Sequence, residues 1–160
     1  GLNLGLCSVG NMGSVRRFDY SVLGDAVNLA SRLEGLCKAF RVDIIASGAV
    51  REEVADFAWL DLGRAVVAGR SSTTAIFTLA GDASFAASAE FAQWKRAHEE
   101  MMACYMARDL LRAAEQARAL AARVAPQWRE LYINLKRRFD ASARSPQETD
   151  WSPIWMMDSK

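Results

Sequence analysis

The segment of residues 19–34, DYSVLGDAVNLASRLE, constrains the fold of this chain more than any other. A short strand-like run passes through a Gly-Asp turn into a stretch whose apolar residues recur with helical spacing. We predict a helix over Asp25–Phe40, with Asp25 as its N-cap. A strand that turns directly into an amphipathic helix favours a fold of mixed α and β structure.

Two polar residues share one face of this predicted helix. Asn28 and Arg32 are four residues apart, so their side chains lie one above the other. An amide and a guanidinium aimed the same way just past a strand end can hold a phosphate-bearing ligand. The alternative is a surface ion pair of Arg32 with Glu34 or another nearby acid, with Asn28 merely packed, and spacing alone favours this alternative.

Residues 1–81 and 82–160 differ in character. The first part alternates strand-like and helix-like runs, and Ser47 is predicted as the N-cap of a helix. The second part is rich in alanine and has helical periodicity, with Pro126 at a helix start. We predict an α+β fold with strands at 2–9, 18–23, 42–46, 61–67 and 73–79, a turn at 10–13, and helices at 85–105, 107–124 and 126–139.

The last two predicted helices resemble a helical hairpin of the tetratricopeptide kind. One such hairpin cannot bury its own apolar face, so we expect it to dock on the rest of the chain. The aromatic and methionine residues of 82–160 are predicted as core or docking surface rather than a ligand cage: Trp94, Met101, Met102, Tyr105, Trp128 and Tyr132. Exposed tryptophans are costly, so Trp151 and Trp155 are expected to be covered by a neighbour.

Composition narrows the function classes. A net charge of +1 gives no reason to expect nucleic acid as the main partner. Three unpatterned cysteines indicate ordinary buried thiols in a reducing compartment, and a single histidine argues against a zinc site. No apolar run is long enough to span a bilayer, so no membrane contact is expected from this segment. The chain begins without Met, and we expect it to be an excerpt of a longer protein.

Four ordered motifs carry a resemblance to a known family: GLNLG at 1–5, VGNMGS at 9–14, the segment 19–34, and VAGR at 67–70. Together they resemble the second half of the catalytic domain of bacterial class III adenylate and guanylate cyclases. The resemblance implies the C-terminal half of a ferredoxin-like domain over 1–81, followed by the helical extension 82–160. It also implies conversion of ATP or GTP to the cyclic 3′,5′-monophosphate, at sites shared between two copies of the chain.

The resemblance assigns roles to four residues. Asn28 falls where the family orients the ribose, and Arg32 where it stabilises charge on the transferring phosphoryl group, a role that suits an always-charged, forked side chain. Ser21 falls where the family selects the purine, and a strand serine facing solvent is the even alternative. Arg70 falls where the family places a phosphate-binding lysine in a hairpin turn, and a solvated turn arginine is the alternative.

Cofactors and location follow from the same resemblance. The family binds Mg²⁺ or Mn²⁺ through two aspartates, which are expected upstream of Gly1. No carboxylate of this chain matches them, so this segment alone is expected to be inactive. Residues 82–160 resemble the extension of some bacterial membrane-tethered cyclases. We therefore expect a cytoplasmic enzyme that makes cyclic AMP rather than cyclic GMP. Whether the full-length protein is anchored in the inner membrane stays open.

Two other functions stay open from the sequence. One is a degenerate cyclase-like domain that binds nucleotide or a partner without chemistry, since the metal-binding aspartates are not within the chain. The other is an interaction module in which the helical tail is the functional part.

Overall fold

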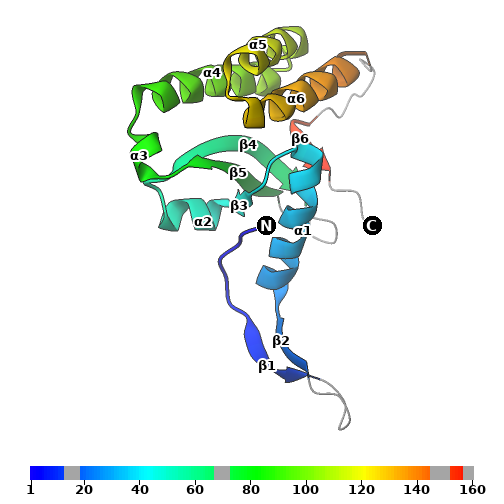
Figure 1. The fold of residues 1–160 in the computed structure, drawn as a ribbon. Helices are drawn as coiled ribbons and strands as arrows, with labels where there is room; N and C mark the ends of the chain where they lie inside the picture. The colour runs from blue at the N-terminus through cyan, green and yellow to red at the C-terminus, as the bar shows by residue number, and fades with distance from the viewer. Residues whose placement is uncertain (13–18, 67–72, 145–151, 157–160) are drawn as a thin grey trace.

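The computed structural model describes residues 1–12, 19–66, 73–144 and 152–156. A four-stranded sheet occupies the middle, a helical layer of α4, α5 and α6 covers one side of it, and α2 and a projecting hairpin lie on the other (Figure 1). The prediction of an α+β fold with a helical C-terminal part is confirmed. None of the described helices combines the length and the apolar character that a membrane crossing requires.

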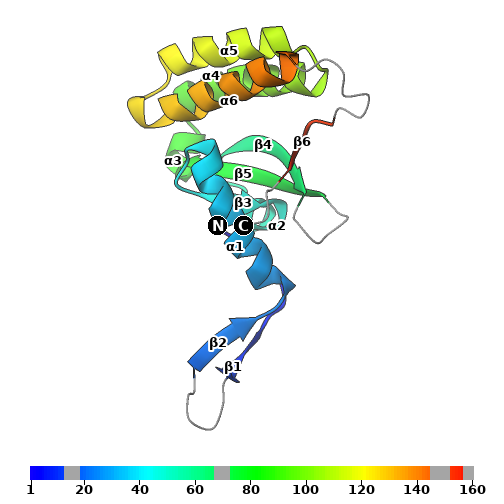
Figure 2. The same cartoon turned by 90° about the vertical axis from the view of Figure 1, so that its right-hand side faces the viewer.

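The hairpin consists of β1 (Ser8–Met12) and β2 (Asp19–Leu23), which pair antiparallel with Gly10 opposite Ser21. It extends away from the sheet at the N-terminal end of α1 (Figure 2). The predicted strand at 2–9 is present only at 8–9, and the predicted turn is wrong over 10–12, because pairing with β2 carries β1 through Gly10. Gly13 lies outside the described residues. Leu2 instead bridges to the edge strand β3, where its amide donates to the Ile45 carbonyl at 2.8 Å.

Helix α1 spans Asp25–Phe40, as predicted. Its buried side chains recur every three or four residues, and this apolar stripe faces the core: Leu29, Leu33, Leu36 and Phe40. The N-cap is Gly24 rather than Asp25, which is the first residue inside the helix and an acid in its first turn. Gly24 has φ 150°, a backbone conformation that suits glycine, and this geometry moves the cap one residue upstream.

The sheet has the order β3-β5-β4-β6, from β3 (Ile45–Ser47), β5 (Thr73–Gly81), β4 (Ala58–Val66) and β6 (Ile154–Met156). Strands β3 and β4 pair antiparallel with β5, whereas β6 pairs parallel with β4. Helix α2 (Gly48–Glu53) follows β3, and Ser47 occupies its N-cap as predicted, although its hydroxyl makes no capping hydrogen bond. A bulge interrupts β4 between Asp61 and Gly63.

The helical layer begins with the short α3 (Ala83–Ala86) and continues as α4 (Ala89–Met106), α5 (Leu110–Arg123) and α6 (Pro126–Arg144). The predicted helix at 85–105 is therefore two helices, because Ser88 caps α4 and accepts a hydrogen bond from the Phe91 amide at 3.0 Å. One continuous apolar core joins α1, the sheet and all three long helices. The expected docking of the helical hairpin on the rest of the chain is thus present.

Candidate functional site

The junction of the hairpin and α1 holds three of the sequence-predicted site residues. Ser21 lies on β2 two residues before the strand ends, and Asn28 and Arg32 lie one turn apart near the start of α1. All three side chains are exposed. Asn28 and Arg32 therefore lie outside the buried apolar stripe of α1, where a ligand can reach them.

The first turn of α1 is fixed in place by the N-terminal segment. The Asn3 amide donates to the Ala26 carbonyl at 3.0 Å, and the Asn28 backbone amide donates to the Gly24 carbonyl at 3.1 Å. These hydrogen bonds fix the backbone of the first turn, on which Asn28 lies.

The fourth predicted residue, Arg70, lies outside the described residues. The strands that lead to its turn are described: their last pair joins Val66 to Thr73. Near this end, the Arg64 Nε donates to the Thr73 hydroxyl at 3.0 Å.

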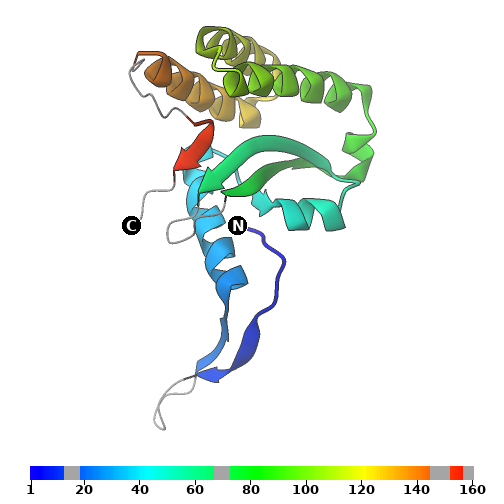
Figure 3. The same ribbon diagram turned by 180° about the vertical axis from the view of Figure 1, so that it is seen from behind.

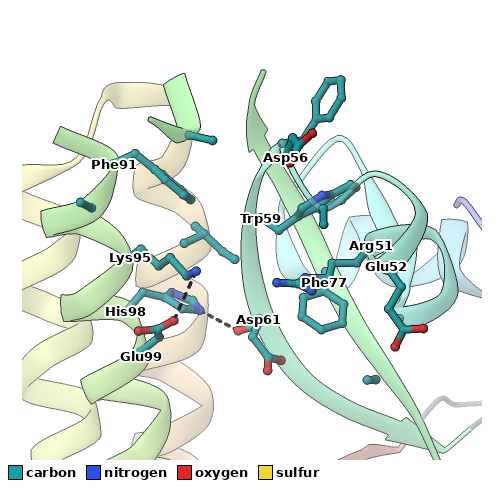
Figure 4. A pocket seen from close by; sticks show the side chains of 17 residues that line it. Arg51, Glu52, Asp56, Trp59, Asp61, Phe77, Phe91, Lys95, His98 and Glu99 are labelled. Carbon is teal, nitrogen blue, oxygen red and sulfur yellow. Dashed lines mark hydrogen bonds and ion pairs between the residues drawn. The ribbon is translucent and has the colours of Figure 1, made fainter. Parts of the chain in front are cut away.

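A separate cavity of about 630 Å³ lies between α4 and the sheet, close to β4 and α2 (Figure 4). Its lining mixes aromatic and charged side chains, and Lys95 forms a long ion pair with Glu99 at 3.8 Å. None of Ser21, Asn28 and Arg32 lines this cavity. The structure therefore does not bring the sequence-predicted residues to it.

His98 lies at the wall of this cavity and is fully buried. Its Nε2 is 2.7 Å from the Asp61 carbonyl oxygen, which can only accept, so Nε2 carries the proton. Nδ1 of the neutral ring then accepts from the Tyr132 hydroxyl at 2.9 Å, and that hydroxyl accepts from Trp94 Nε1 at 2.6 Å. Every polar atom of this chain of hydrogen bonds is satisfied when His98 is neutral.

Burial shifts the titration of these groups. Loss of solvent lowers the pKa of His98 to about 4, although the Asp61 carbonyl acts weakly in the other direction. Burial also raises the pKa of Tyr132. The pKa of the Asp61 carboxyl is raised by desolvation, while the hydrogen bond from the Gly63 amide at 2.6 Å opposes that rise.

Sequence spacing alone assigns no role to His98, yet the structure makes it the polar link between α4 and β4. A signal was available in the apolar stripe of α4, where Phe91, His98, Met101 and Tyr105 are all buried. A histidine in such a stripe must find two hydrogen-bond partners from other elements. Its partners come from residues distant in sequence, which local patterns do not identify.

Among the described residues, no group of three or more His, Cys, Asp or Glu side chains could hold a metal ion. The Mg²⁺ or Mn²⁺ implied by the family resemblance therefore has no set of ligands in this part of the chain. Cys7 is exposed and Cys37 and Cys104 are half-buried, and all three are free thiols.

Residues 1–81 match the family model "Adenylate and Guanylate cyclase catalytic domain". This match covers half of the chain, and the chain belongs to that family. It ends at Gly81, in the last residue of β5, so the helical layer lies beyond the matched segment.

Three curated relatives carry the name adenylate cyclase. Adenylate cyclase 1 of Rhizobium meliloti (strain 1021) is 39% identical over 82 residues, which is 51% of this chain and 12% of the relative. Adenylate cyclase of Anabaena cylindrica is 42% identical over 50 residues, 31% of this chain and 10% of the relative. The terminal-differentiation specific adenylate cyclase of Dictyostelium discoideum is 47% identical over 45 residues, 28% of this chain and 2% of the relative.

A solved bacterial light-regulated adenylyl cyclase is 30% identical, with a TM-score of 0.39, covering 46% of this chain and 36% of that one. The chain thus spans a small part of each curated relative. The segment that the family model matches holds Ser21, Asn28 and Arg32.

Proposed function

We propose that the complete protein is a nucleotidyl cyclase that makes cyclic AMP from ATP, with cyclic GMP the less favoured product. Residues 1–81 supply the second half of its catalytic domain. The observation that carries this proposal is the family match over residues 1–81. Within that segment Asn28 and Arg32 are both exposed on α1. A nucleotide-facing pair must be accessible to the ligand, and the exposure of both side chains supports the proposal.

Arg32 acts on the phosphates in this proposal. Negative charge builds on the phosphate oxygens as pyrophosphate leaves, and a guanidinium that is always charged stabilises it at the moment it forms. Asn28, one turn earlier, hydrogen-bonds the ribose and orients its 3′ oxygen toward the α-phosphorus. Ser21 on β2 contacts the purine edge, and Arg70 contacts the phosphates.

A divalent cation supplies further charge neutralisation in such reactions. The described residues contain no cluster of His, Cys, Asp or Glu side chains that would bind this cation.

The site is open on the hairpin side, and we propose that a second copy of the chain closes it. Apolar side chains are exposed along the hairpin and the segment before it, with Leu6 98% and Tyr20 77% exposed. Val9 adds to this surface, because the cross-strand pairing places it on the same face of the hairpin as Tyr20. Exposed apolar groups on one face are typical of interaction surfaces. A partner that covers them lies next to the start of α1, where Asn28 and Arg32 are presented.

The test uses the full-length parent protein, assayed for cyclic AMP and cyclic GMP formation from ATP and GTP with Mn²⁺. Arg32→Ala should lower turnover at least about a hundredfold, the scale of losing one charge partner of the transition state. Lys38→Ala is the matched control, because Lys38 is an exposed cation on the same helix, in its last turn. Equal turnover of both variants, with urea melts like the parent's, would remove Arg32 from the mechanism.

Ser21→Asp tests the base contact separately. A carboxylate only accepts hydrogen bonds, whereas a hydroxyl also donates, so the ratio of ATP to GTP turnover should shift. An unchanged ratio in a variant of unchanged total activity would leave Ser21 as a solvent-facing strand residue.

A further inference from the structure

The C-terminal strand β6 is held by contacts of the kind that a bound peptide makes. Within the described residues three pairs join it to β4 in parallel register: Ile154 with Arg64, Trp155 with Ala65, and Met156 with Val66. Figure 3 shows β6, in red, below α6 and beside the end of α1. Strand addition of this sort is a common mode of peptide recognition, in which pockets for side chains supply specificity.

We propose that residues 152–156 act as a detachable, tryptophan-anchored peptide ligand, bound by a groove between β4 and helices α1, α4 and α6. The groove is a binding site for an extended peptide with a central tryptophan. Its occupant in this chain is the chain's own tail, docked in cis.

The groove surrounds Trp155, which is only 2% exposed, with side chains from three helices. Its indole stacks on Tyr105 of α4, with ring centroids 5.2 Å apart and planes at 16°, and meets Phe40 of α1 edge-on at 5.0 Å. The Arg138 guanidinium of α6 lies 4.0 Å from the centroid of the indole ring, a cation–π geometry. An aromatic slot with an arginine over its occupant is typical of an interface hot spot.

The polar end of the indole also has a dedicated partner. Trp155 Nε1 donates to the Leu62 carbonyl, which lies in the bulge of β4. Gly63 permits this close approach, because a Cβ there would lie 3.2 Å from that nitrogen, and its φ of +91° is one that side chains rarely adopt. The bulge thus exposes a carbonyl and removes a side chain at the position where a tryptophan must enter.

The sheet does not need β6 for its own pairing. Strand β4 keeps its partner β5 from Ala58 to Val66 on its other edge. When β6 leaves, an open strand edge at Arg64–Val66 and the slot for the indole remain together. These are the two features that a strand-adding peptide recognises.

The experiment uses the full chain with a protease recognition sequence placed within residues 145–151. After cleavage the released tail is washed out, and a fluorescein-labelled peptide DWSPIWMMD, the sequence of residues 150–158, is titrated and followed by polarisation. Saturable binding is expected. A Trp155→Ala peptide should bind at least about 30-fold more weakly, which is the scale of a hot-spot residue.

The control is a Ser152→Ala peptide, which changes an exposed side chain of the same segment and should bind within about threefold of the parent peptide. Absence of saturable binding to a cut chain with an unchanged circular dichroism spectrum would overturn the proposal. Equal weakening by the two substitutions would overturn it as well.

A second measurement on the uncut chain covers the case in which the cut chain unfolds. Amide hydrogen exchange should show the protons of 154–156 opening without those of β5, since a docked peptide leaves before the sheet does. If they exchange only together with β5, the segment is an integral strand and the groove is not a peptide site.

Discussion

Acidification should destabilise this protein through one residue, His98. The ring is fully buried and neutral, and its two nitrogens already have a carbonyl acceptor and a hydroxyl donor. A proton added at Nδ1 would force the Tyr132 hydroxyl to accept there instead of donating, and the hydrogen of that hydroxyl would lose its acceptor. Folding therefore holds His98 in its neutral form.

The size of the effect follows from the two pKa values. Burial lowers the pKa of His98 from 6.5 to about 4. Between these values the unfolded chain binds a proton that the folded chain does not, so stability falls as the pH falls. At about 1.4 kcal/mol for each pKa unit, the loss reaches about 3 kcal/mol by pH 4. This contribution is absent above pH 6.5, where His98 is neutral in both states.

Urea unfolding at pH 7, 6 and 5 measures this slope, and His98→Gln serves as the reference. The variant is expected to be less stable at every pH, so the comparison is between slopes and not between absolute stabilities. The parent should lose about 1.4 kcal/mol more per pH unit than the variant below pH 6.5. Asp61 acts in the opposite sense, because its carboxyl pKa is raised in the folded state, and it is present in both proteins.

A nuclear magnetic resonance titration tests the same reasoning directly. The chain contains one histidine, so one imidazole resonance should stay at its neutral position down to about pH 5. A midpoint near 6.5, or parallel stability slopes in parent and variant, would refute the argument that the buried network excludes the proton.

Two further substitutions, each with a control elsewhere in the chain, probe the bulge of β4 and the hydrogen bonds of His98. Gly63→Ala should lower the free energy of unfolding, measured by urea melts, by about 2 kcal/mol or more, because Gly63 has a positive φ and lies close to the Trp155 indole. Gly35→Ala should raise it by about 0.5–1 kcal/mol, because Gly35 lies within α1 and a Cβ there meets open space. Tyr132→Phe should cost about 2 kcal/mol by leaving the histidine without its donor. Tyr20→Phe, on the exposed hairpin, should change stability by less than about 0.5 kcal/mol, and equal effects of the two tyrosine changes would contradict the network.

Helix α1 was predictable to its end residues because its apolar stripe is a local pattern. The position of β1 was not, because the antiparallel pairing with β2 sets its register. The burial of Trp155 followed from the cost of exposing an indole, but its partners on α1, α4 and α6 are distant in sequence. The roles of Ser21, Asn28, Arg32 and Arg70 stay predictions.

The bulge of β4 accepts hydrogen bonds from two elements that lie beyond the family match, α4 and β6. It presents two consecutive carbonyls outward: Asp61 accepts from His98 on α4, and Leu62 accepts from Trp155 on β6. A regular strand would turn successive carbonyls to opposite edges, so one extra residue in β4 is what makes both donors fit. Changes that straighten the bulge should therefore loosen α4 and β6 together, although these elements are more than forty residues apart in the chain. Two polar contacts that residues beyond the family match make with the sheet therefore lie at one bulge. That bulge is in β4, the strand that precedes Arg70, which is predicted to bind phosphate.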